Sequence, residues 1–235
     1  MSLFSYHLVE LSFASALKSL FVPLKVTQVN GLIHSETMSV MKLGSSIFSI
    51  TRIFSKKVVF FAQWENESAL TLFLNENNFG KKLAKGWYVK LQFLRQWGKF
   101  DGFKTKEFNT EAINHVNTPV VAVTIARMKY TEIPRFLKWG KPVEKLVRDH
   151  KGTTLSLASI RYPNTVSTFS IWINQQEMTN MVYGHNEIPE PRRHINAMKE
   201  NERKKFHFEF ATYRFKTISE HGSWNNQSHF IPYKR

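Results

Sequence analysis

Two short stretches decide the fold: Val58-Val-Phe-Phe-Ala-Gln-Trp64 and Thr168-Phe-Ser-Ile-Trp172. Both are rich in β-branched and aromatic residues, which favour strands. Each is followed by a segment with helical character, and then by a closing strand with Trp and Gly at its end, at residues 87–98 and 211–224. The chain therefore repeats one plan, and internal repetition on this scale is a strong architectural signal.

Each half reads as strand, helix, strand, strand, helix, strand, which is the split βαβ or ferredoxin-like plan. Two such units in one chain commonly pair their sheets into an α/β barrel. We therefore predict an α+β protein made of two tandem ferredoxin-like repeats in a dimeric α/β-barrel architecture. The first half is expected at residues 1–103, a linker at 104–118 and the second half at 119–235.

The patterns also predict individual elements. In the first half we expect strands at 6–11, 46–54, 57–63 and 87–97, helices at 14–21 and from 65 onward, and a long connection at 25–42. In the second half we expect strands at 119–128, 153–161, 165–174 and 210–218, and helices at 132–150, 175–182 and 190–205. Gly140-Lys-Pro142 is expected to break the helix at 132–150 into two pieces, because proline removes a backbone donor.

The chain is strongly basic, with 33 Lys and Arg against 18 Asp and Glu and a net charge of +15. Such a balance suits nucleic acid, an anionic membrane surface or an acidic ligand. No RNP motif, zinc finger or Gly-rich KH loop accompanies the scattered basic residues, so we expect no nucleic-acid function. The sequence also predicts no transmembrane helix and no secretory signal. We expect a cytoplasmic protein whose basic face can rest on an anionic membrane.

The absence of cysteine excludes disulfides, Cys-ligated zinc and iron–sulfur clusters, thiolate-bound haem and a Cys nucleophile. GxGxxG, P-loop, HExxH and GxSxG patterns are also absent from the sequence. Phenylalanine occupies 20 positions. This excess of aromatic residues predicts either a large aromatic core or a pocket for a flat or long apolar ligand.

One polar turn has no counterpart in the first half: Tyr183-Gly-His-Asn-Glu-Ile-Pro-Glu-Pro-Arg-Arg-His194. It lies between the strand at 165–174 and the helix at 190–205. Because it is the main difference between two otherwise parallel halves, we expect this turn and the start of the following helix to carry the chemistry.

Several of these segments resemble the spheroidene monooxygenase-like family. Thr168-Phe-Ser-Ile-Trp172, the helix near His194, Tyr213-Arg-Phe215 and Gly222-Ser-Trp224 resemble its C-terminal signature. Gln96-Trp-Gly-Lys-Phe-Asp-Gly-Phe103 and Thr118-Pro-Val-Val-Ala122, followed by Arg135-Phe136, resemble earlier segments. The resemblance spans about residues 87–230 and implies a haem-dependent carotenoid oxygenase. The tandem plan also resembles haem-binding dimeric α/β barrels, including aldoxime dehydratases and chlorite dismutases, in which an axial His comes from the second half.

A haem without a cysteine ligand needs His, Tyr or Met on the iron, and neutral imidazole is a good ligand. His194 resembles a His of the family pattern and is the first candidate, with His185 as the alternative; the competing interpretation of each is a surface or capping residue. Arg193 and Arg127 are candidates for haem propionates, since guanidinium binds carboxylate in bidentate fashion. Either arginine also suits an ordinary surface ion pair.

Four residues on the expected strands are candidates for a substrate pocket, although strand aromatics more often fill a core. These residues are Phe169, Ile171, Trp172 and Tyr213.

The resemblance implies a haem-dependent monooxygenase that inserts oxygen into an apolar, carotenoid-like substrate and draws on an external electron donor. Two alternatives stay open: a haem dehydratase of the aldoxime dehydratase type, and a non-catalytic protein that binds haem or a small ligand. A homo-oligomer is compatible with each. The sequence identifies neither the substrate nor the donor.

Overall fold

In the computed structural model, residues 2–41, 55–105, 117–185 and 188–232 are described. The first half contains β1 (Leu3–Glu10), α1 (Phe13–Phe21), β2 (Leu32–Met41), β3 (Lys57–Trp64), α3 (Glu67–Glu76), α4 (Asn78–Leu83) and β4 (Trp87–Lys99). The second half contains β5 (Val120–Met128), α5 (Ile133–Asp149), β6 (Thr153–Arg161), β7 (Thr165–Trp172), α6 (Gln175–Tyr183), α7 (Arg193–Arg203) and β8 (His207–His221).

The eight strands form one closed barrel in the order β1-β3-β2-β6-β7-β5-β8-β4, and neighbouring strands run antiparallel. Within it, β4-β1-β3-β2 and β8-β5-β7-β6 follow the same strand order, so each half is a ferredoxin-like unit. The halves join where β2 pairs with β6 and where β4 pairs with β8. The predicted fold class is therefore confirmed. Most of the expected linker, at 106–116, lies outside the described residues.

Two expectations about individual elements were wrong. Residues 25–42 are not one long connection, because they contain β2. The polar run His34-Ser-Glu-Thr37 hid this strand, whose pairing with β3 and β6 is set by the barrel. Helix α5 continues through Pro142 instead of breaking there. Proline removes one helical hydrogen bond. The helix is nevertheless packed on both sides of Pro142, by Phe136 before it and by Leu146 after it. The strand expected at 46–54 lies outside the described residues.

The barrel interior is filled by aromatic side chains from both halves. Tyr6 of β1 stacks on Phe169 of β7 with 3.9 Å between ring centroids, and Phe4 lies 5.0 Å from Phe215 of β8. Phe103, which follows β4, turns back into the interior and lies 4.8 Å from Phe61. An eight-stranded barrel is just wide enough for its own side chains to fill it, so the phenylalanine excess serves chiefly as core.

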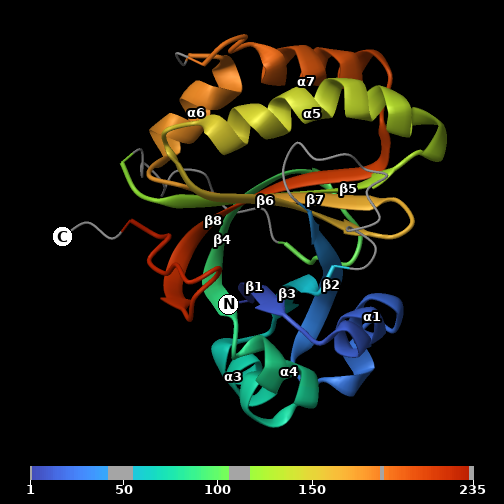
Figure 1. Cartoon of the computed structure of the whole chain (residues 1–235), viewed down its shortest axis with the longest axis vertical. Coiled ribbons are helices and arrows are strands. Elements are labelled where there is room, and N and C mark those ends of the chain that lie inside the picture. The colour runs from blue at the N-terminus through green and yellow to red at the C-terminus, as the bar shows by residue number, and fades with distance from the viewer. Residues whose placement is uncertain (1, 42–54, 106–116, 186–187, 233–235) are drawn as a thin grey trace.

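Helices cover the outer face of the barrel on two opposite sides (Figure 1). Helices α1, α3 and α4 pack on the first-half strands, and α5, α6 and α7 lie over the second-half strands. Within the described residues, no helix has both the length and the apolar character needed to cross a membrane.

His7 gives the first-half core a pH-dependent stability. The residue is fully buried on the outward face of β1, where its Nε2 lies 2.9 Å from Ser5 Oγ. Burial lowers the pKa of His7 from 6.5 to about 3. The unfolded chain therefore binds more protons than the folded chain between these values, and the stabilising effect of neutral His7 is lost as pH falls below 6.5.

We expect His7→Gln to flatten the decline of unfolding free energy between pH 6.5 and 4 by up to about 1.4 kcal/mol per pH unit. Urea unfolding at several pH values measures this slope. The control is His185→Gln, because His185 is exposed. Equal slopes in wild type and His7→Gln would contradict the assignment.

Candidate functional site

Cross-strand pairing arranges the outward-facing residues of the second-half sheet in two adjacent rows that continue onto β4. One row runs Ala158, Thr168, Thr124, Thr212, Trp97, and the next runs Ser156, Ser170, Ala122, Arg214, Arg95. We call the seven small members of these rows the small-residue floor: Ser156, Ala158, Thr168, Ser170, Ala122, Thr124 and Thr212. The floor therefore ends at one side in Trp97 and two arginines.

Two apolar clusters, packed beneath α5 and α6, bound this floor. Trp172 packs with Leu146 of α5 and Met178 and Met181 of α6 at one end. At the other end Ala126, Met128 and Phe206 pack together, with Phe210 beside them. Between them, Thr124 and Thr212 are only half-buried and share a 3.0 Å hydrogen bond.

Helices α5 and α7 pack loosely for a helical layer over a sheet. Each of these fully described helices buries just one residue, Leu146 in α5 and Asn201 in α7. The floor thus offers small and hydroxyl side chains where a tightly packed interface would hold large apolar ones. Five of these seven residues are half-buried, while Ala158 and Ser170 are buried.

His194 lies in the first turn of α7 and is half-buried against the last turn of α6. Burial lowers the pKa of His194, and a hydrogen bond to the backbone of Val182 opposes this shift without cancelling it. The imidazole is therefore neutral at pH 7, and the backbone contact favours one orientation of the ring. Ligating histidines are commonly held in this way, with one ring nitrogen bonded to a carbonyl.

The conformation of Gly184 lets the polar turn fold back and place His194 against α6. Gly184 caps α6 in the left-handed conformation, with φ of 72°, which glycine adopts without strain. A Cβ atom at Gly184 would lie 3.0 Å from the carbonyl oxygen of Pro191, so the end of the polar turn folds closely onto the end of α6. His185 follows this cap, is exposed, and donates its backbone N–H to the Asn180 carbonyl at 2.8 Å.

The structure separates the two arginines that we expected to act together. Arg193 is next to His194 and its Nε lies 2.8 Å from Glu190 Oε2. Arg127 belongs to the inward-facing set of β5, where it pairs with Glu209 at 2.9 Å and lies over the Phe100 ring at 5.3 Å. Arg127 and His194 are thus on opposite faces of the sheet and do not form one site.

The expected pocket residues are separated in the same way. Phe169, Ile171 and Tyr213 are fully buried inside the barrel. Trp172 points to the helical layer, where it donates to Ser170 Oγ at 2.8 Å and its ring lies 5.2 Å from His150. Of the four, only Trp172 shares a face with His194, and contact of any of them with a substrate stays a prediction.

Sequence reasoning missed Arg95 and Arg214. Arg214 lies over the Trp97 ring at 4.7 Å and Arg95 at 4.5 Å. Burial, and to a smaller extent the charge of Arg95, lower the pKa of Arg214 to about 10. The alternation in Tyr213-Arg-Phe215 indicates that Arg214 points outward, but its pairing with Arg95 depends on an irregularity in β4 that no local pattern predicts.

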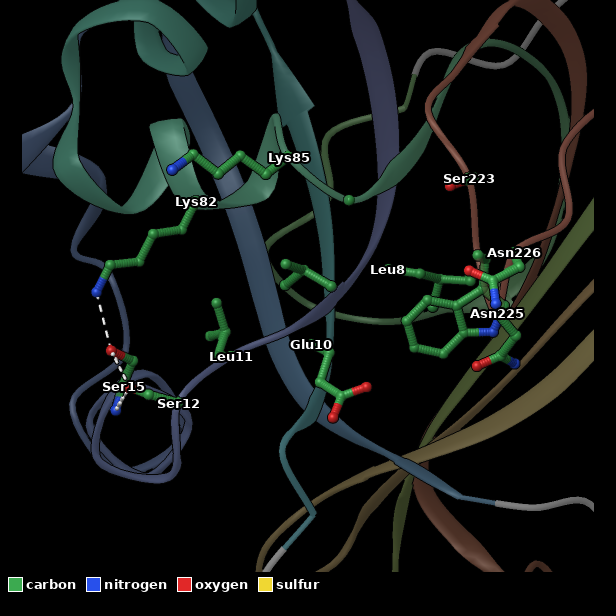
Figure 2. Close-up of a pocket in the computed structure, with 13 residues that line it drawn as sticks. Leu8, Glu10, Leu11, Ser12, Ser15, Lys82, Lys85, Ser223, Asn225 and Asn226 are labelled. Atoms are coloured by element: carbon green, nitrogen blue, oxygen red, sulfur yellow. Dashed lines mark hydrogen bonds between the residues drawn. The ribbon is translucent and has the colours of Figure 1, made fainter.

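A concave region lies elsewhere on the barrel. It is an open pocket of about 690 Å³ formed where β1 ends, α1 begins and the chain leaves β8 (Figure 2). Glu10, Lys82 and Asn225 are among its lining residues, and Lys82 Nζ donates to Ser15 Oγ at 2.9 Å. None of the residues expected to bind the cofactor, the iron or the substrate lines this pocket. In the described part of the chain, no group of three or more His, Asp or Glu side chains is placed to hold a metal ion.

No protein-family model and no curated protein matches this sequence. Solved structures do match the fold. An aldoxime dehydratase in complex with butyraldoxime has a TM-score of 0.55 at 8% identity, covering 92% of this chain and 79% of that one. A second aldoxime dehydratase structure has a TM-score of 0.50 at 8% identity, covering 92% and 81%. A candidate monooxygenase from Fusobacterium nucleatum has a TM-score of 0.40 at 8% identity, covering 94% of each chain.

At these identities the likeness concerns the fold alone. The chain has the ferredoxin-like, dimeric α/β-barrel fold that the aldoxime dehydratase structures also have.

Phe169 is suited to a test of its role in the core. It is fully buried and stacks on Tyr6, so Phe169→Ala should lower the unfolding free energy by about 3–5 kcal/mol. Phe208→Ala is the matched control, because the Phe208 side chain is 64% exposed. Denaturant unfolding that gives similar small losses for both variants would show that Phe169 is not a packing residue.

Proposed function

We propose that this protein is a haem-dependent oxidoreductase, a monooxygenase acting on an apolar, carotenoid-like substrate, with His194 as the residue that would hold the iron. One observation carries the proposal: a neutral, half-buried imidazole is held against the backbone of Val182 at the contact between α6 and α7. A neutral imidazole is one of the ligands that a haem without a thiolate can use.

The residues present fit such a group. Haem can be held by a single strong protein ligand, which His194 can supply. Arg193, beside His194, is our candidate for a propionate partner, and would exchange Glu190 for the propionate. Arg127 is not part of this proposal, since it faces the barrel interior.

When bound, haem would supply the activation of dioxygen, with electrons from an external donor. The chain's own residues have simpler tasks. The backbone of Val182 orients the His194 ring, and burial keeps that ring unprotonated and able to bind. Trp172 and Met178 form a packed apolar cluster on the same side of the sheet. The α6–α7 contact restricts access of water to His194.

A visible spectrum tests the haem assignment. Protein expressed with ample haem should show a Soret band, and His194→Ala should lose or shift it. His185→Ala is the control and also tests the alternative ligand, and its spectrum should match the wild type. Protein that stays colourless and takes up no haem on titration would overturn the proposal. Loss of the band in His185→Ala alone would move the ligand to His185.

Dehydration of an aldoxime is the second candidate, proposed on the likeness in fold to aldoxime dehydratase. The two reactions differ in what they consume, because a monooxygenase needs dioxygen and electrons and a dehydratase needs neither as a reactant. Conversion of butyraldoxime without oxygen would favour the dehydratase. Turnover of an apolar substrate only with oxygen and reductant would favour the monooxygenase. Haem binding with neither activity would leave a binding protein.

The net charge of +15 supports a further proposal, peripheral association with an anionic membrane from which an apolar substrate could be collected. We expect the protein to bind phosphatidylserine vesicles at low salt and to release them as salt rises. Vesicles of neutral lipid are the control. Failure to sediment with anionic vesicles at low salt would contradict the idea.

A further inference from the structure

Two arginines face each other across neighbouring strands at the edge of the small-residue floor. Arg95 of β4 is directly opposite Arg214 of β8. Like charges placed directly opposite on adjacent strands destabilise a sheet. Among the described residues, no carboxylate lies within ion-pair distance of either guanidinium. Within the described part of the chain, the pair is therefore a concentration of positive charge without a carboxylate partner.

A β-bulge creates this pairing. The register of β4 against β8 shifts between Phe93, which pairs with Phe215, and Arg95. With a regular register, Leu94 would lie opposite Arg214, and Arg95 would lie opposite Tyr213 and point into the barrel. The extra residue turns Arg95 and Trp97 to the outer face instead. Bulges commonly re-aim side chains in this way next to functional sites.

Contacts with Trp97 stabilise the two guanidinium groups but do not pair their charges. Both guanidinium groups lie over its ring, at 4.5 Å for Arg95 and 4.7 Å for Arg214, and are attracted to its π face. These contacts neutralise no charge. The Nε atom of Arg214 is also buried without a hydrogen-bond partner in the described part of the chain. A buried donor of a charged group is costly unless it is paired.

We propose that Arg95 and Arg214 bind the carboxylate or phosphate group of a small-molecule ligand whose body lies over the small-residue floor. Two guanidinium forks on one face match the oxygens of such a group. Ala122 pairs with Arg214 and Thr212 with Trp97, so the floor continues without interruption from the anion site. The proposal does not depend on haem, since none of these residues is the proposed iron ligand.

Calorimetric titration of the full chain tests the site with three probes: octanoate, octanol and inorganic phosphate. Octanol has the body of octanoate without its charge. We expect octanoate to bind and octanol to bind at least roughly tenfold more weakly. Arg214→Gln and Arg95→Gln should each weaken octanoate binding by roughly tenfold or more. Lys216→Gln is the matched control, because it removes the same charge from the next outward position of β8, and it should leave binding unchanged.

The outcomes separate the possibilities. Phosphate binding without octanoate binding, lost in both arginine variants, would support the site and assign it to a phosphate group. Equal binding of octanol and octanoate would overturn the proposal, as would no binding of either anion at millimolar concentration. Weakening by Lys216→Gln equal to that by Arg214→Gln would also overturn it. A short single-stranded RNA that binds and is weakened equally by all three variants would show a diffuse basic surface instead.

Thermal unfolding provides a second readout that does not need a tight ligand. In buffer without multivalent anions, Arg95→Gln should unfold at a higher temperature than wild type, because the like-charge contact is relieved. Octanoate or phosphate should stabilise the wild type more than the variant. A variant that is no more stable in such buffer and gains as much from the anion would contradict the proposal.

Discussion

Closure of the barrel is the constraint on which the other features depend. Pairing of β2 with β6 and of β4 with β8 joins two four-stranded sheets into one and leaves no free sheet edge among the eight strands. The closed sheet has one inner face and one outer face, and each strand contributes alternate residues to the two. The side chains of a strand therefore point alternately to the shared interior and to the outer face, parts of which the helices cover.

The interior is occupied by the protein's own rings. Tyr6, Phe61 and Phe169 meet there across the two halves at ring distances of 3.9–5.9 Å. A barrel of eight strands has little space beyond what its side chains fill. A ligand is consequently better placed on the outer face of the second half, where small hydroxyl side chains replace large apolar ones and α5 and α7 bury little.

The two halves share a fold but differ in what lies on their outer faces. In the first half, Trp64, Phe60 and Phe73 pack the sheet tightly against α3. In the second half, the polar turn after α6 brings His194 to Val182, and at the junction with the first half the bulge in β4 brings Arg95 to Arg214. One copy of the repeat therefore stabilises the barrel, while the other has the features of a site. Two guanidinium groups of this basic chain lie together over Trp97.

Local composition by itself determined the repeat, the fold class and most of the second-half elements, because β-branched and aromatic runs, proline and glycine act over a few residues. It also singled out the turn that ends at His194. Only the tertiary structure decided which face each residue occupies: Arg127 and three of the four expected pocket residues point into the barrel, and Trp172 points out of it. The strand at Leu32–Met41 and the pairing of Arg95 with Arg214 were likewise beyond local reasoning. Both depend on register between strands far apart in the chain, and a shift of one residue reverses the face of every side chain that follows.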